Sequence, residues 1–188
     1  MAHDVLRSIC VFCGSRPGAD PAFTAAAAGF GRVIAERGIT LVYGGARVGL
    51  MGSVADAALA AGGRVVGVIP RALVSKEVLH DGLSELFLTE TMAQRKEQMM
   101  ALSDAFVALP GGFGTYDELF EALTLAQIGI HDKPNGLLDV GGFFRPLLAL
   151  LRHAVEHGFA GESDARLVVA EEAPERLLAA LAERARRS

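Results

Sequence analysis

A glycine-rich loop followed by acidic residues is the stretch of this sequence best suited to act on a bound ligand. It runs from Pro110 to Glu118 and contains three glycines. The apolar segment 105–109 before it predicts a buried parallel strand, and the pattern after it predicts an amphipathic helix. The glycines allow a tight turn and a close approach of a ligand, and the helix start offers unpaired N–H groups and partial positive charge. This order favours a phosphate site, to which Thr115 can add a hydroxyl.

The same residues also fit a plain helix start. Thr115 and Glu118 have the spacing of a capping box, in which Glu118 only holds the beginning of its own helix. Neither named phosphate fingerprint is present: there is no Gly-Lys-Ser/Thr, and Asp117 stands where a dinucleotide fingerprint requires its third glycine. From the loop alone, a ligand site and a simple turn both stay open.

A helix predicted over 92–102 carries two cations on its apolar side. Arg95 shares a face with Met99, and Lys96 lies beside Met100. Cations in such a place cost free energy unless they meet anions, although long side chains can also extend past the edge of the apolar surface. We therefore expect both to reach a buried carboxylate, a ligand phosphate, or both. Arginine suits this task because its planar guanidinium binds such groups through two hydrogen bonds.

The helix after the glycine loop supplies the carboxylates. Asp117, Glu118 and Glu121 cluster away from its predicted apolar face. That face comprises Tyr116, Leu119, Phe120, Leu123 and Gln127. Acidic clusters are usually solvated, but Leu125 and Ile128 continue the acidic side, and one sheet cannot bury both sides of a helix. We therefore expect a homodimer in which a second subunit packs there, with Glu118 and Glu121 near an intersubunit cleft.

Strands and helices alternate along the whole chain. Strands are predicted at 8–13, 39–43, 64–69, 85–88, 105–109, 135–140 and 167–170. Helices are predicted at 21–37, 53–61, 92–102, after the glycine loop, and at 144–157 and 174–187, with a short helix and loop over 71–83. This alternation predicts an α/β, doubly wound, Rossmann-like fold with helices on both faces of a parallel sheet. Glycine loops after strands one, two and five should line one crevice.

Composition narrows the class of protein. The 188 residues, 51% hydrophobic with 22 glycines, suit a single α/β domain over 1–188. The net charge of −4 argues against a nucleic-acid partner. The first residues lack a basic region leading into an apolar run, and no apolar stretch is long enough to span a bilayer. We expect a cytoplasmic protein without membrane association.

Two other pairs of residues could suggest a metal or redox site. Cys10 and Cys13 form a Cys-x-x-Cys, but within a strand they would point to opposite faces, and there is no second ligand pair. His153 and His157 stand four residues apart without the pattern His-Glu-x-x-His. The sequence therefore predicts no metal site.

Taken together, the motifs resemble those of the LONELY GUY family, cytokinin-activating phosphoribohydrolases long described as lysine decarboxylases. The matching stretches are 11–15, 43–45, 49–52, 95–96 and 110–118, and the resemblance continues to about Val140. It implies a Rossmann-like homodimer with active sites at the subunit interface. The implied reaction is hydrolysis of the N-glycosidic bond of a cytokinin riboside 5′-monophosphate, which frees the substituted adenine and leaves ribose 5-phosphate. No metal or organic cofactor is implied.

The resemblance also assigns roles to residues. It places the catalytic arginine and glutamate on Arg95 and Glu118. Nucleotide-binding positions and glycine-loop residues of the matched motifs give these substrate-binding candidates: Ser15, Gly44, Gly45, Met51, Glu77, Lys96, Gly111, Gly112, Phe113, Gly114, Thr115, Tyr116, Asp117 and Thr124. Two departures are Ala93, where the family often has histidine, and Leu125, where it often has tryptophan. The first bears on the position of the arginine, and the second on the interface or the base pocket.

The implied chemistry agrees with these residue types. Breaking this bond builds positive charge on the ribose, an oxocarbenium-like state that glycosidases stabilise with carboxylates. Glu118 would stabilise the charge and orient water, and Arg95 would orient Glu118 and keep it ionised. The glycine loop would hold the 5′-phosphate, remote from the bond being broken.

Three alternatives stay open. The first is a less selective nucleosidase acting on AMP. The second is a non-catalytic nucleotide carrier or sensor, which needs the glycine loop but no arginine and carboxylate poised together. The third is an amino-acid decarboxylase, which would need a lysine that carries pyridoxal phosphate.

Overall fold

The computed structural model describes residues 6–74 and 79–187. Within them, seven strands form one sheet in the order β4-β3-β2-β1-β5-β6-β7, and each neighbouring pair is parallel. The strands are β1 (Ser8–Phe12), β2 (Thr40–Tyr43), β3 (Val65–Pro70), β4 (Glu85–Thr89), β5 (Ala105–Ala108), β6 (Asn135–Leu138) and β7 (Val168–Glu171). The predicted doubly wound α/β fold is confirmed.

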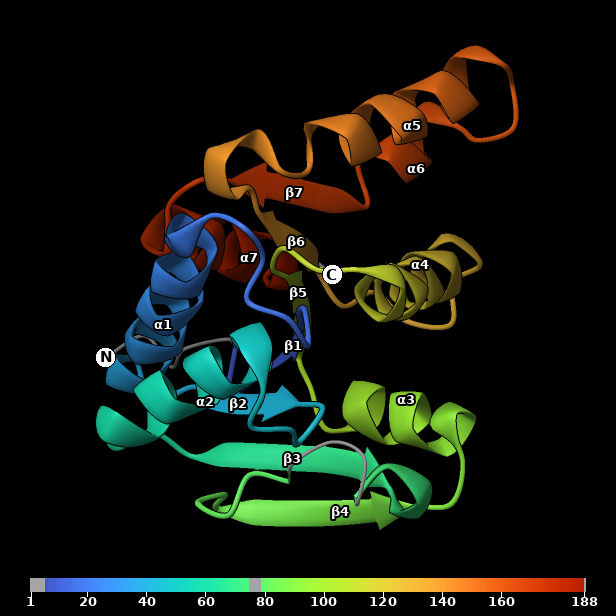
Figure 1. The fold of residues 1–188 in the computed structure, drawn as a ribbon. Helices are drawn as coiled ribbons and strands as arrows, with labels where there is room; N and C mark the ends of the chain where they lie inside the picture. The colour runs from blue at the N-terminus through green and yellow to red at the C-terminus, as the bar shows by residue number, and fades with distance from the viewer. Residues whose placement is uncertain (1–5, 75–78, 188) are drawn as a thin grey trace.

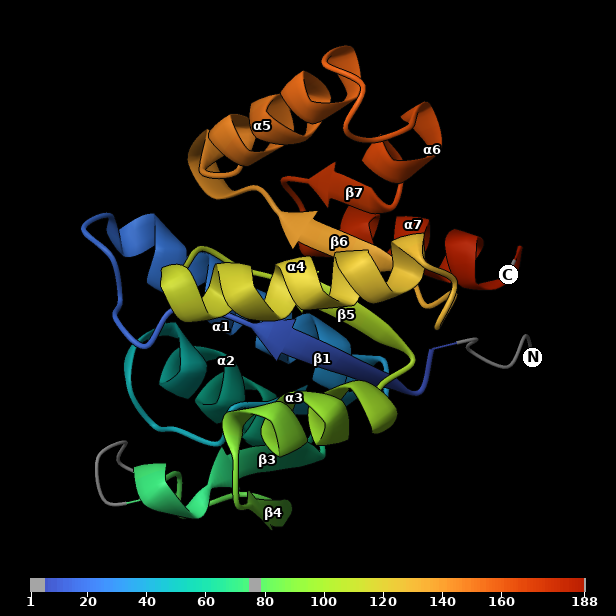
Figure 2. The same ribbon diagram turned by 90° about the vertical axis from the view of Figure 1, so that its right-hand side faces the viewer.

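Helices cover both faces of the sheet. One layer consists of α1 (Pro21–Glu36), α2 (Gly49–Ala60) and α7 (Pro174–Ala185), and the other of α3 (Met92–Ala101), α4 (Phe113–Gln127) and α5 (Arg145–Glu156). Figure 1 shows the sheet between these two layers, and Figure 2 shows α3 and α4 side by side in front of the strands. Among the described helices, none combines the length and the hydrophobicity needed to cross a membrane.

Alternating strand residues fill the two cores. In β1, Ile9 and Val11 join the core beneath α1 and α2, whereas Cys10 and Phe12 join the core beneath α3 and α4. Cys13 lies in the first core and Cys10 in the second, and both thiols are free. The prediction that these cysteines point to opposite faces is confirmed, because successive strand side chains alternate between faces.

The order of the strands in the sheet switches from one side of β1 to the other. Strands β2, β3 and β4 lie on one side of β1, and β5, β6 and β7 lie on the other. The loops after β1 and β5 meet at this point, where Gly14 N donates a hydrogen bond to Pro110 O at 3.0 Å. The β1 loop also accepts one from α2, since Leu50 N donates to Gly14 O at 3.0 Å. The glycine loops therefore gather at one edge, as predicted for a topological switch point.

Helix α2 starts four residues earlier than predicted, and one short helix was not predicted. Helix α2 begins at Gly49 rather than at Ser53. Glycines are poor helix formers, which is why the sequence pattern favours a later start, but Gly49 and Gly52 allow close packing at the beginning of this helix. A Cβ on Gly52 would lie 2.3 Å from Arg47 O, and one on Gly49 would lie 2.4 Å from the Ser15 carbonyl carbon. The short helix α6 (Glu162–Ala165) was not predicted; Asp164 Oδ2 accepts from Gly161 N at 2.7 Å and holds its start. Over 71–83, the described part begins with a 3₁₀ turn, Arg71–Leu73.

Two glycines in α1 give opposite predictions for stability. A Cβ on Gly31 would lie 2.2 Å from Val54 O of α2, so Gly31→Ala should lower the free energy of unfolding by about 1–3 kcal/mol through overpacking. A Cβ on Gly29 meets no described atom within 4 Å, so Gly29→Ala should raise it by up to about 1 kcal/mol. Urea unfolding of both variants measures the difference. Equal effects of the two substitutions would contradict the close α1–α2 packing.

Candidate active site

The amino end of α4 lacks a side-chain cap among the described residues. The helix begins at Phe113 with Gly112 as its N-cap, and no described side chain caps it. Thr115 is therefore the third residue of the helix and 3% exposed. This contradicts the capping-box alternative, which needs Thr115 at the N-cap position. The first backbone N–H groups of α4 remain available for a ligand.

The glycine before the N-cap explains why the helix can start so early. A Cβ on Gly111 would lie only 2.0 Å from Thr115 Oγ1 and 2.9 Å from Gly14 N. A side chain at this position would push the first turn of α4 away from the β1 loop. The sequence pattern of glycines thus allows the helix end to sit directly against the sheet edge.

Arg95 is a buried cation at the same edge. Its side chain is held by two backbone carbonyls, one within β3 and one directly after β2, with Nε 3.0 Å from Val68 O and Nη2 3.1 Å from Gly44 O. The residue is 5% exposed. The prediction that Arg95 lies on the buried side of α3 is confirmed. These two carbonyl oxygens accept hydrogen bonds from the guanidinium without cancelling its charge, so an anion nearby would be stabilised.

Glu118 lies at the same cavity as Arg95. This cavity has a volume of about 160 Å³ and is lined by Cys13, Gly14, Ser15, Met51, Arg95, Gly112, Phe113, Gly114, Thr115 and Glu118. A second cavity of about 540 Å³ adjoins it and shares Gly14, Ser15, Gly112 and Phe113 with it. Gly111 is among the residues that line the second cavity but not the first. Eight of the predicted site residues therefore meet around one cavity beside the amino end of α4.

The predicted orientation of α4 was partly wrong. Glu118 is 9% exposed on the buried side, together with Thr115 and Ala122, rather than in an outward acidic cluster. Phe120, expected to pack on the sheet, is instead 37% exposed. The small side chain of Ala122 lets this side of the helix approach the sheet closely, and helical spacing brings Glu118 in with it.

Lys96 meets the other two acids of that cluster. Its Nζ lies 3.0 Å from Asp117 Oδ2 and also pairs with Glu121. Hydrogen bonds from Lys96 to Glu121 and Asp117 raise the pKa of the lysine, against the opposing effect of burial. Lys96 thus reaches carboxylates, but they are not the buried ones predicted, since the Asp117 side chain is 58% exposed. Neither Lys96 nor Asp117 is among the described residues that line the cavity.

The remaining candidates lie around the cavity or away from it. Gly44 and Gly45 do not line the cavity. Gly44 O accepts a hydrogen bond from Arg95 Nη2, and Gly45 O accepts one from His80 N at 3.0 Å. Tyr116 is half-buried against the core, and Thr124 is exposed on the outer side of α4. Glu77 lies outside the described residues.

Two cavity residues, Cys13 and Gly14, were not proposed as site residues. Their signal was their place directly after β1, at the edge where the glycine loops meet. Burial raises the pKa of the Cys13 thiol, and the neighbouring Glu118 carboxylate raises it further. The same two causes raise the pKa of Cys10. Both thiols are thus held protonated, which makes them poor nucleophiles.

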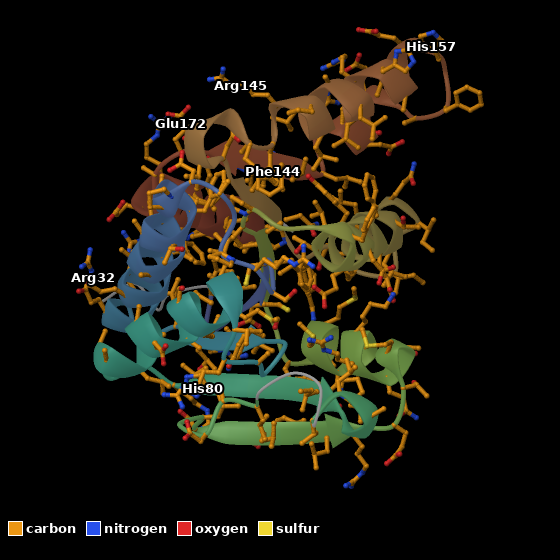
Figure 3. The ribbon with its side chains drawn as sticks, viewed as in Figure 1. Arg32, His80, Phe144, Arg145, His157 and Glu172 are labelled. Atoms are coloured by element: carbon orange, nitrogen blue, oxygen red, sulfur yellow. The ribbon has the colours of Figure 1, made fainter. Side chains whose placement is uncertain are left out.

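Two histidine features lie apart from the cavity. His80, labelled in Figure 3, is 5% exposed and bonds Asp56 Oδ1 through Nε2 at 3.0 Å, while its Nδ1 accepts from Gly82 N. It thereby anchors residues 79–82 against α2 and the β2 loop. The rings of His153 and His157 are tilted by 47° with centres 4.0 Å apart, and Figure 3 shows His157 at the outer end of α5.

Solved structures share this architecture. The molybdenum cofactor binding protein of Rippkaea orientalis superposes with a TM-score of 0.70 at 24% identity, over 94% of this chain and 95% of that one. The molybdenum cofactor carrier protein of Chlamydomonas reinhardtii gives 0.70 at 23% identity, over 94% and 96%. At such identities the likeness supports the fold alone.

Sequence comparison is more specific. Residues 51–181 match a family model described as "Possible lysine decarboxylase". A cytokinin riboside 5′-monophosphate phosphoribohydrolase of Rhodococcoides fascians is 50% identical over 159 residues, 84% of this chain and 80% of the relative. The enzyme of the same name, LOG, of Oryza sativa subsp. japonica is 46% identical over 163 residues, 87% of this chain and 67% of the relative. The chain therefore belongs to the LONELY GUY family of cytokinin riboside 5′-monophosphate phosphoribohydrolases.

Proposed function

We propose that this protein hydrolyses the N-glycosidic bond of cytokinin riboside 5′-monophosphates, releasing the substituted adenine and ribose 5-phosphate. The observation that carries the proposal is the burial of Arg95 and Glu118 at one cavity beside the uncapped amino end of α4. The names of the relatives, at 46–50% identity, support the same reaction. The proposal includes a cytoplasmic location, as the sequence predicts.

The amino end of α4 is the proposed site of the 5′-phosphate. The first N–H groups of the helix and its dipole favour a dianion there. The Ser15 and Thr115 residues line the same cavity and carry hydroxyl groups. Phosphate binding at this point would supply binding energy away from the reacting bond, which positions the ribose over Glu118.

Glu118 and Arg95 are the proposed catalytic pair. As the bond from ribose C1′ to the base nitrogen breaks, its electron pair leaves with the base and positive charge develops on the ribose. The Glu118 carboxylate would stabilise this charge and orient the water that adds to C1′, while a proton ends on the base. Arg95, fixed in place by Val68 O and Gly44 O, would hold a positive charge at the cavity that Glu118 also lines.

The decarboxylase alternative finds less support. It would require a lysine in the site to carry pyridoxal phosphate. Lys96 is held by Asp117 and Glu121, and Lys133 Nζ donates to Met100 O at 2.8 Å. Neither of these described lysines lines the cavity that holds Arg95 and Glu118.

Release of free base is the direct test. Isopentenyladenosine monophosphate and AMP are incubated with the wild type and with Glu118→Gln, and free base is quantified by chromatography. We expect wild type to release base from the substituted nucleotide, and Glu118→Gln to lower kcat by about 10²–10⁴-fold. Glu97→Gln, an exposed carboxylate of α3, is the matched control and should match the wild type.

Other results of this assay would point elsewhere. Equal release from both nucleotides would indicate an AMP nucleosidase. Protection of the protein against heat by both nucleotides, without base release, would indicate a carrier or sensor. Consumption of lysine by a preparation that absorbs near the visible range would indicate a decarboxylase.

Gly44 gives a second test of the role of Arg95. A Cβ at Gly44 would lie 2.1 Å from Arg95 Nη2 and 3.1 Å from Met51 Sδ, so Gly44→Ala must move the guanidinium. Because flexible side-chain ends yield readily, the fold should survive, whereas kcat should fall by at least about tenfold. Base release and the thermal midpoint are measured together, with Gly29→Ala as the glycine control. An active Gly44→Ala variant would argue against a precise role for the guanidinium.

We also propose a homodimer that completes the site. The outer side of α4 exposes Phe113 (96%), Phe120 (37%) and Ile128 (63%), and neighbouring α3 exposes Met92 (43%). A row of apolar side chains of this kind usually marks an interface. Phe113, the most exposed of these side chains, also lines the cavity of Arg95 and Glu118. A second copy packed on this side would enlarge and close the site.

Disruption of the apolar row tests the dimer. Ile128→Asp places a charge in the proposed interface and should convert the dimer to a monomer with reduced base release. Leu150→Asp, at an equally exposed leucine of α5 (55%), is the control and should leave the dimer intact. Light scattering coupled to size-exclusion chromatography gives the mass. A monomeric wild type at micromolar concentration would refute the proposal.

A further inference from the structure

One lysine ties α3 to α4 on the outer side of the candidate active site. Lys96 Nζ lies 3.0 Å from Asp117 Oδ2 and 3.3 Å from Asp117 Oδ1, and it also pairs with Glu121. The two acids stand four residues apart and therefore share one side of α4. The Lys96 side chain is 15% exposed, that of Glu121 30% and that of Asp117 58%, so solvent and salt screen the pair with Glu121 less than the pair with Asp117.

The same three residues adjoin the proposed catalytic pair in the chain. Lys96 directly follows Arg95 on α3, and Asp117 directly precedes Glu118 on α4. Arg95 and Glu118 turn inward and line the cavity, whereas Asp117 is exposed. A change in the separation of α3 and α4 at Lys96 would therefore change the separation of Arg95 and Glu118 by a similar distance.

We propose that Lys96, held between Asp117 and Glu121, is a positioning residue that sets the distance between Arg95 and Glu118. The inference rests on the function proposed above. It differs from the nucleotide-binding role that the family resemblance implies for Lys96. The ammonium has three donors, and in this structure they face two carboxylates. A displacement of about 1 Å between catalytic groups can cost about 10²-fold in rate.

Glu121 separates the two roles, because it is not among the substrate-binding candidates. The variants Lys96→Met, Lys96→Arg and Glu121→Gln are compared by steady-state base release from isopentenyladenosine monophosphate. We expect Lys96→Met to lower kcat by about 10–100-fold with KM changed by less than about threefold. Glu121→Gln should lower kcat in the same way, and Lys96→Arg should keep most of it, since arginine can bridge carboxylates.

The double variant tests whether the residues act as one unit. Lys96→Met combined with Glu121→Gln should be no slower than Lys96→Met alone, because the same contact is lost once. Arg152→Met, which removes an ion pair of Arg152 Nη1 with Glu162 at 2.8 Å between α5 and α6, is the control and should leave kcat and KM unchanged. A rise in KM at constant kcat for Lys96→Met, with Glu121→Gln like wild type, would overturn the proposal in favour of a direct phosphate contact.

A failure of the proposed function would be visible separately. If wild type releases no base from either nucleotide, that function is wrong, and the link between α3 and α4 is then measured by thermal unfolding. Lys96→Met and Glu121→Gln should lower the midpoint by similar amounts, and the double variant by no more than the larger of the two. Additive shifts would show that Lys96 and Glu121 act independently and would also overturn the positioning role.

Discussion

The burial of the Arg95 guanidinium is the constraint on which the rest of this site depends. A buried cation is tolerated only where polar partners replace water. Here the partners are two carbonyl oxygens, of Val68 in β3 and of Gly44 after β2. They converge because parallel strands end at a common edge. A Cβ on Gly44 would lie 2.1 Å from the guanidinium, so the glycine leaves room for the position that Arg95 adopts. The burial of Arg95 therefore depends both on the order of the strands, which brings the two carbonyls together, and on the glycine at position 44.

The opposite wall of the cavity follows from a second close approach. Gly111 lets the first turn of α4 lie against the β1 loop, with Thr115 directly above it. Ala122 keeps the same side of α4 near the sheet, and Glu118 is carried inward by helical spacing. The helix thus presents its open amino end and a carboxylate to one cavity. Gly111 sets the distance from α4 to the β1 loop, and Ala122 sets the distance from α4 to the sheet. The chemistry therefore depends on small residues that cannot themselves react.

The same architecture supports different roles in different proteins. The molybdenum cofactor carrier of Chlamydomonas reinhardtii superposes on this chain with a TM-score of 0.70, although the two share only 23% of their residues. A glycine loop at a topological switch point is a general anion site that carriers and enzymes can both use. The features that favour an enzyme here are the buried Arg95 and Glu118, which simple binding of a phosphate would not require.

The sequence by itself determined the fold class, the glycine edge and the burial of Arg95, whereas Glu118 was singled out by family resemblance and not by a local pattern. Strand and helix periodicities, glycine positions and a cation on the apolar side of α3 are local patterns, and local patterns survive without knowledge of packing. Only the tertiary structure decided that α4 begins at Phe113, that Glu118 faces inward while Phe120 faces outward, and that Lys96 joins Asp117 and Glu121. These outcomes depend on how closely two helices and a sheet approach. Close contacts such as that of Gly111 with Thr115 set these distances. The periodicity of hydrophobic residues along the sequence contains no information about such distances.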